Sequence, residues 1–134
     1  MSGFVVDTSV WIDFFAGRPV RGLEEALESG MVVLPPVVVA ELVSGARRAG
    51  QRRQITELVE SLPVHATPVA HWVRVGELRR AAAERGVAVS TPDAHVAQCA
   101  LDNGAILLSR DQVFSRLRVC CDLEVWSARP EAPE

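Results

Sequence analysis

Four acidic residues lie where predicted secondary-structure elements meet, and they are the residues of this chain most suited to chemistry. Asp7 follows the apolar run 4–6, Glu41 lies on a predicted helix, Asp93 begins another helix, and Asp111 follows the apolar run 105–108. In a parallel α/β sheet such positions meet at the carboxyl edge of the strands, where ligands bind. We therefore predict that the four carboxylates form one site.

Such a site needs a cation. Two unit charges about 4 Å apart interact by roughly 4 kcal/mol at an effective dielectric constant near 20, so clustered carboxylates repel one another. Repulsion raises their pKa values and destabilises the fold. Hard cations such as Mg²⁺ or Mn²⁺ prefer oxygen ligands. We predict a Mg²⁺ site, with Mn²⁺ as substitute, in which Asp7 and Asp93 are primary ligands and Glu41 and Asp111 complete the set.

Each acid also has an ordinary structural explanation. Asp7 and Asp111 stand where helix N-caps are expected, and an acid in a first turn, such as Asp93, complements the helix dipole. Glu41 alone would be interpreted as a solvated side chain. The metal hypothesis therefore depends on the four acids as a set.

Neighbouring side chains could support this site. Ser9 and Ser109 each lie two residues from a proposed ligand and could orient a carboxylate, although simple capping is equally compatible with their positions. Arginines near the site could bind the phosphates of a nucleic acid, or could be solvated helix ends. They are Arg47, Arg48, Arg52, Arg53 and Arg110.

The surrounding pattern predicts the fold. Short, unbroken apolar segments alternate with amphipathic helical segments, which is typical of a parallel sheet covered on both faces. We expect an α/β protein, a three-layer α/β/α sandwich with a four- to five-stranded parallel sheet. Strands are predicted at 4–6, 31–34, 64–66, 105–108 and 123–126, and helices are predicted to begin near Pro19, Pro36, Pro68 and Thr91.

Composition narrows the function classes. The 134 residues carry a net charge of −3, and all 14 basic residues are Arg, so mechanisms that need a catalytic Lys are excluded. The three cysteines form no C-x-x-C motif, which argues against a disulfide framework and a structural zinc site. The three histidines are interpreted as structural or surface residues. Asp13 could reach the site or form an ion pair.

The chain length suits one domain, expected over residues 1–127, with a disordered tail at 128–134. Asp7 interrupts the early apolar run, so no signal peptide is expected. The longest apolar stretch, 31–40, is too short to cross a bilayer. A cytoplasmic domain without membrane attachment is expected.

Three sequence blocks together resemble PIN-domain proteins, and specifically VapC-type toxins of toxin–antitoxin pairs. The blocks are FVVDTSVWID at 4–13, VVVAELVSG at 37–45, and STPDAHVAQCALDNGAILLSRDQVF at 90–114. The resemblance places Asp7, Glu41, Asp93 and Asp111 on the acidic quartet of that family. Ser109 stands where the family usually has Thr, which keeps the hydroxyl.

The resemblance implies a PIN-like fold and a Mg²⁺- or Mn²⁺-dependent endoribonuclease that hydrolyses RNA phosphodiesters, leaving a 5′-phosphate and a 3′-hydroxyl. It also implies growth inhibition through blocked translation, a VapB-type antitoxin whose C-terminal segment enters the active-site groove, a homodimer, and a toxin–antitoxin hetero-oligomer. A second hypothesis remains open: a metal- and RNA-binding interaction module that does not cleave. A small-molecule phosphatase is a third, weakened because Ser9 stands where the D-x-D-x-T pattern requires its second Asp.

Overall fold

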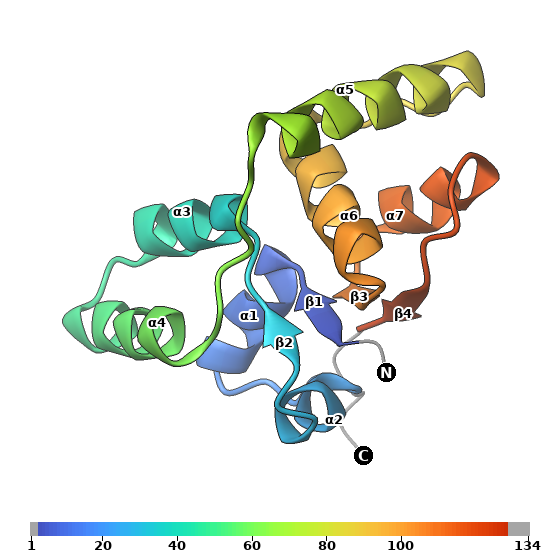
Figure 1. The fold of residues 1–134 in the computed structure, drawn as a ribbon. Helices are drawn as coiled ribbons and strands as arrows, with labels where there is room; N and C mark the ends of the chain where they lie inside the picture. The colour runs from blue at the N-terminus through green and yellow to red at the C-terminus, as the bar shows by residue number, and fades with distance from the viewer. Residues whose placement is uncertain (1–2, 129–134) are drawn as a thin grey trace.

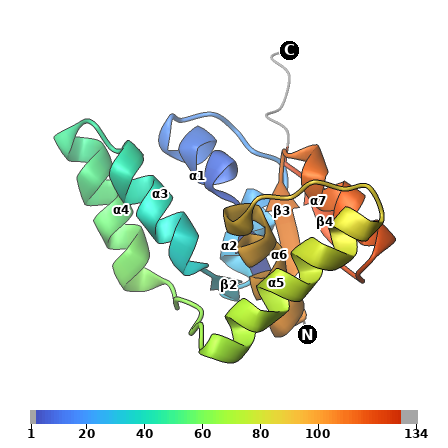
Figure 2. The same cartoon turned by 90° about the horizontal axis from the view of Figure 1, so that it is seen from above.

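A computed structural model describes residues 3–128 of the chain (Figures 1 and 2). Short strands alternate with helices along most of this range, as the apolar periodicity predicts. The elements, in chain order, are β1 (Phe4–Val6), α1 (Thr8–Phe15), α2 (Leu23–Glu28), β2 (Val32–Val33), α3 (Pro36–Gly45), α4 (Ala49–Ser61), α5 (Val69–Glu84), α6 (Thr91–Asn103), β3 (Ile106–Ser109), α7 (Gln112–Arg116), the 3₁₀ turn η1 (Leu117–Val119) and β4 (Val125–Ser127).

The four strands form one parallel sheet in the order β2-β1-β3-β4. Val6 pairs with Leu108, and Leu108 pairs with Trp126, so the carboxyl ends of β1, β3 and β4 lie at one edge. The strand residues of β1 and most of β3 are buried, which explains why their sequences are apolar without alternation. The register brings Asp7 and Ser109 next to each other.

Helices complete the predicted three-layer α/β/α sandwich, and this fold class is confirmed. Helix α6 packs on β1 and β3, and α5 packs on α6. Helices α3 and α4 lie side by side and extend away from β3 and β4, as both views show (Figures 1 and 2). Trp11, Phe114 and Leu107 are among the largest side chains of the core.

Several predicted boundaries are wrong in detail. The helix expected from Pro19 begins at Leu23, because Gly22 at φ +88° bends the chain just before it. The strand expected at 64–66 is reduced to a single bridge between Leu34 and Val64. The cap expected at Thr91 is supplied by Ser90, whose Oγ accepts a hydrogen bond from the Asp93 N–H.

The predicted tail, 128–134, lies outside the described residues except for Ala128. Ala128 is buried, and its N–H donates a hydrogen bond to the Ser109 carbonyl. Within residues 3–128, every helix is too short or too polar to cross a membrane.

Candidate active site

Asp7 lies at the carboxyl end of β1 and is only 8% exposed. Its backbone N–H donates to the Leu108 carbonyl and continues the β1–β3 ladder beyond Val6. As the N-cap of α1, its Oδ1 accepts a hydrogen bond of 2.9 Å from the Thr8 N–H. Asp7 is therefore a helix cap, and its Oδ2 is not used by that cap.

Ser109 joins Asp7 to Asp111. Its hydroxyl is buried and donates to Asp7 Oδ2 at 2.9 Å, while its oxygen accepts the Asp111 N–H at 3.0 Å. Ser9 lies farther from the same carboxylate oxygen, at 3.4 Å. Both predicted supporting serines thus contact Asp7, and Ser109 makes the shorter contact.

Glu41 reaches the same edge from α3. Its side chain is exposed, and its Oε1 accepts a hydrogen bond of 2.9 Å from the Thr8 hydroxyl. Thr8 therefore contacts two of the four acids, Asp7 through its amide and Glu41 through its hydroxyl. Sequence reasoning treated Thr8 only as a capping residue, although its position directly after Asp7 is the signal that could have identified it.

Asp93 and Asp111 approach from the other side, in the first turn of α6 and at the N-cap of α7. Asp111 Oδ1 caps α7 by accepting the Val113 N–H at 3.0 Å. Asp93 is half-buried and Asp111 is exposed. Both acids keep carboxylate oxygens that helix capping does not use.

The charges of the acids affect the pKa values of Asp7 and Asp93. Burial raises the pKa of Asp7, the hydrogen bonds from Ser109 and Thr8 oppose that rise, and the charges of Asp93 and Glu41 add to it. Burial also raises the pKa of Asp93, a hydrogen bond with Ser90 opposes it, and the charges of Asp111 and Glu41 add to it. Asp93 therefore interacts with all three other acids.

This donor set fits a hard divalent cation, because it consists of carboxylate and hydroxyl oxygens. The described carboxylates nevertheless do not bring three ligand atoms within 4.8 Å of one another. Such closeness occurs instead in a separate group formed by His65, His71 and Cys99. Like charges approach closely only when a cation lies between them, whereas neutral imidazoles and a thiol carry no such repulsion.

A basic hollow lies beside Glu41. A small cavity of about 120 Å³ is lined by Ile12, Phe15, Glu41, Leu42, Gly45, Ala46, Gln51 and Ile55. It shares Phe15, Gly45 and Gln51 with a larger hollow of about 940 Å³, whose lining includes Arg47, Arg48 and Arg53. The cavity beside Glu41 therefore neighbours a hollow lined by three of the arginines that could bind phosphate.

Arg110 forms an ion pair with Asp13, which is one of the two roles expected for Asp13. Its guanidinium lies 2.9 Å from Oδ2 of Asp13, as an ion pair without an aligned hydrogen bond, and Arg18 holds Oδ1 at 3.2 Å. The Asp13 carboxylate is 1% exposed. The buried ion pair of Asp13 with Arg110 thus connects α1 to the residue directly before Asp111.

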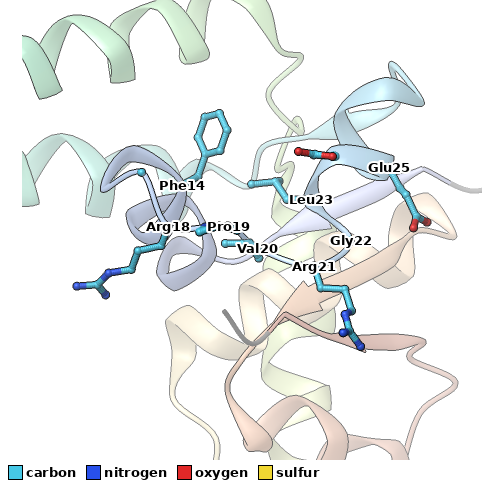
Figure 3. A pocket seen from close by; sticks show the side chains of 10 residues that line it. Phe14, Arg18, Pro19, Val20, Arg21, Gly22, Leu23 and Glu25 are labelled. Carbon is cyan, nitrogen blue, oxygen red and sulfur yellow. The ribbon is translucent and has the colours of Figure 1, made fainter. Parts of the chain in front are cut away.

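Figure 3 shows another pocket, between α1 and α2, with a volume of about 530 Å³. Phe14, Arg18 and Arg21 are among its lining residues, and none of the four acids is among the described residues that line it. This pocket lacks a convergent set of catalytic groups.

The histidines are more deeply placed than expected. His71 and His95 are both fully buried between α5 and α6, and their rings are joined by a hydrogen bond of 2.7 Å. A pattern in the sequence could have indicated this burial. Polar residues recur at spacings of three and four on α6 and form a stripe on a largely buried helix; they are His95, Gln98, Cys99 and Asp102.

Comparison with known proteins identifies the family. The model of the PIN domain matches residues 4–119, so the chain belongs to the PIN domain family. No curated protein matches the chain.

Solved structures share the fold. The chain resembles VapBC2 from Rickettsia felis bound to a promoter DNA fragment, at 19% identity and TM-score 0.75, covering 94% of this chain and 98% of that one. It also resembles VapBC-1 from nontypeable Haemophilus influenzae, at 22% identity and TM-score 0.74, covering 92% and 96%. A third is VapBC-5 from Mycobacterium tuberculosis, a member of the VapBC family of toxin–antitoxin systems, at 23% identity and TM-score 0.68, covering 95% and 99%.

Proposed function

We propose that this PIN-domain protein is a Mg²⁺- or Mn²⁺-dependent endoribonuclease and the toxin of a VapBC-type toxin–antitoxin pair. The observation that carries the proposal is the hydrogen-bonded link of Asp7 to Asp111 through Ser109 and to Glu41 through Thr8, at the carboxyl edge of the sheet. The similarity in fold to VapBC structures over nearly the whole chain supports the toxin assignment. RNA cleavage to block translation would place the protein in the cytoplasm.

Asp7 and Asp93 would be the primary metal ligands, and Glu41 and Asp111 would complete the set. Their oxygen donors suit Mg²⁺ or Mn²⁺. When bound, such an ion activates water as a nucleophile and stabilises the negative charge that develops at the phosphorus centre. Burial and the neighbouring acids raise the pKa values of Asp7 and Asp93 in the metal-free fold. A bound cation would compensate the negative charge of the two carboxylates.

The remaining residues hold this set in place. Ser109 directs Oδ2 of Asp7 and fixes the backbone of Asp111, while Thr8 ties Glu41 to the start of α1. These contacts would order the carboxylates before substrate binds. Less free energy is then needed to reorganise the site when the transition state forms. Ser109 and Thr8 are therefore positioning residues.

The hollow near Glu41 suggests how RNA approaches. Arg47, Arg48 and Arg53 line it and would contact substrate phosphates, which bind Arg guanidinium groups bidentately. The neighbouring cavity, lined in part by Ile12 and Ile55, suits a segment of a VapB-type antitoxin. An antitoxin bound there would cover the approach to the acids and block cleavage.

The decisive experiment compares purified wild-type protein with Asp93→Asn on structured RNA in the presence of Mn²⁺. Cleavage by wild type and a loss of at least about a hundredfold in Asp93→Asn are expected, because metal coordination needs the charged carboxylate. Asp122→Asn, an exposed acid remote in sequence from the four, is the matched control and should cleave as wild type does.

Equal cleavage by wild type and Asp93→Asn would contradict the assignment. If wild type binds RNA and Mn²⁺ without turnover, the chain is the non-cleaving interaction module instead. Expression in bacteria, with and without a co-expressed VapB-type antitoxin, tests the toxin role separately: growth arrest should require Asp93 and should be relieved by the antitoxin.

A further inference from the structure

A second cluster of metal-ligating side chains lies between α5 and α6, apart from the four acids. His71 comes from α5, His95 and Cys99 come from α6, and His65 comes from the connection that precedes α5. His71, His95 and Cys99 are fully buried. Ligand atoms of His65, His71 and Cys99 all lie within 4.8 Å of one another.

Hydrogen bonds define the orientation of His71. Its Nδ1 lies 2.8 Å from Oδ2 of Asp102, and a carboxylate can only accept, so Nδ1 carries the proton. Asp102 is itself held by Arg74 at 2.9 Å and by Gln98 at 2.8 Å. The Nε2 lone pair of His71 therefore points away from Asp102 and accepts the Nδ1–H of His95 at 2.7 Å, a hydrogen bond that a metal at Nε2 would replace. A carboxylate on the other ring nitrogen is how proteins orient a histidine to bind a metal.

Two groups in the cluster lack a strong partner. The buried Nε2 of His65 has no hydrogen-bond partner among the described residues. The Cys99 thiol lies 3.8 and 3.9 Å from the two ring nitrogens of His95, contacts that are weak for a hydrogen bond. Leaving a buried polar nitrogen without a hydrogen bond destabilises the fold. A ligand that bonds to His65 and Cys99 together would remove that destabilisation.

We propose that His65, His71 and Cys99 bind Zn²⁺. Zinc is held in tetrahedral geometry by imidazole and thiolate ligands, and three protein ligands leave the fourth position for water. The site would join α5, α6 and the connection before α5, and it does not depend on the nuclease assignment.

The distances are compatible with binding by three ligands. Zinc–nitrogen bonds of about 2.0–2.1 Å and zinc–sulfur bonds of about 2.3 Å place tetrahedral ligand atoms about 3.3–3.7 Å apart. The ligand atoms of His65, His71 and Cys99 lie within 4.8 Å of one another, so they need to move closer together to bind one ion.

Zinc binds a thiolate and not a thiol, so binding at Cys99 should release a proton and strengthen as pH rises.

Asn103 restricts how His65 can bind a metal. Its Nδ2 lies 3.1 Å from His65 Nδ1 and donates at 2.7 Å to the Cys99 carbonyl. Metal at Nε2 requires a proton on Nδ1, so the His65 ring must turn away from Asn103 Nδ2, which keeps its hydrogen bond to the Cys99 carbonyl.

Cobalt provides the test, because Co²⁺ replaces zinc and absorbs light when a thiolate binds it. The full chain, stripped with a chelator, is titrated with Co²⁺ in excess Mg²⁺, which occupies the acidic site. One Co²⁺ per chain with a thiolate-to-cobalt absorption band, displaced by Zn²⁺, is expected. Cys99→Ala should lose the band, whereas the double variant Cys120→Ala/Cys121→Ala and the Asp93→Asn variant should keep it.

Absence of the band in wild type, or its persistence in Cys99→Ala, would overturn the proposal and leave the cluster as a hydrogen-bonded part of the core. If Cys99→Ala does not fold, His65→Gln takes its place, because the His65 side chain is 17% exposed and tolerates change better. It should weaken cobalt binding, and unchanged affinity would also overturn the proposal. Asp102→Asn should weaken zinc affinity by about tenfold to a hundredfold, because Asp102 orients His71.

Discussion

The hydroxyl of Ser109 donates a hydrogen bond of 2.9 Å to the carboxylate of Asp7, although 102 residues separate them in the chain. The contact follows from the parallel pairing of β1 with β3, which aligns Val6 with Leu108 and places the next residue of each strand at the same edge. The same Ser109 oxygen accepts the Asp111 N–H. One buried hydroxyl thus positions two of the proposed metal ligands.

Replacing Ser109 with Ala should weaken Mn²⁺ binding by about tenfold, because groups that orient metal ligands commonly contribute tenfold to a hundredfold to affinity. Mn²⁺ titration followed by calorimetry measures the change. Ser109→Thr keeps the hydroxyl and should restore most of the affinity, and Ser115→Ala on the exposed side of α7 is the control. Equal affinity in Ser109→Ala and wild type would show that the hydroxyl only fills space.

Replacing Asp7 with Asn should stabilise the metal-free protein at neutral pH. The folded-state pKa of Asp7 is raised, so the folded state binds the proton more tightly than the unfolded state does. Stability from this group is therefore present at low pH and is lost as pH rises from 3.8 through the folded-state pKa. The melting temperature of Asp7→Asn should exceed that of wild type at pH 7 with a chelator present, and the difference should shrink towards pH 4.

Added Mn²⁺ should reverse the order of the two melting temperatures, so that wild type melts above Asp7→Asn. The ion binds the folded wild type and raises its melting temperature by mass action, whereas Asp7→Asn should respond less. A large loss of metal-free stability in Asp7→Asn would instead identify Asp7 as a structural cap.

Replacing Arg110 with Met should destabilise the fold more than replacing Arg18 with Met. Asp13 is buried, and its Oδ2 faces Arg110, which is 37% exposed, whereas Arg18 is 63% exposed and more fully solvated. Removing the less solvated cation leaves more uncompensated charge, so we expect a loss of about 1–3 kcal/mol for Arg110 and under about 1 kcal/mol for Arg18. Urea unfolding measures both, and the reverse ranking would contradict the ionic link.

Replacing Val69 and Val73 with Glu should convert the expected homodimer to a monomer. These residues and Trp72 lie on one side of the first turns of α5, and they are 79%, 54% and 43% exposed. Charges on such a patch oppose burial against a second copy. Sedimentation velocity tests this, with Val119→Glu, an exposed apolar residue outside α5, as the control. A monomeric wild type, or a dimeric double variant, would exclude this surface as the interface.

The candidate site was largely predictable from sequence, because its residues follow strand ends. Asp7 comes directly after an apolar run and Asp111 shortly after another, and parallel strands bring such positions together whatever the exact register. Glu41 and Asp93 could be placed only as members of the set, because a helical acid has a solvated alternative. Ser109 could be identified from its distance to Asp111, but its contact with Asp7 depends on strand register.

The sequence by itself determined the α/β class, the parallel sheet and the positions of the four acids, because hydrophobic periodicity and strand-end placement are local signals. Three features depend on long-range packing, and only the tertiary structure reveals them. They are the Thr8–Glu41 contact, the burial of Asp13 between two arginines, and the proximity of His65, His71 and Cys99. The sequence left a structural and a surface role open for the histidines, because burial depends on which face of α5 packs against α6. The packing of the whole core determines which face of α5 is buried, and no short segment of the sequence predicts it.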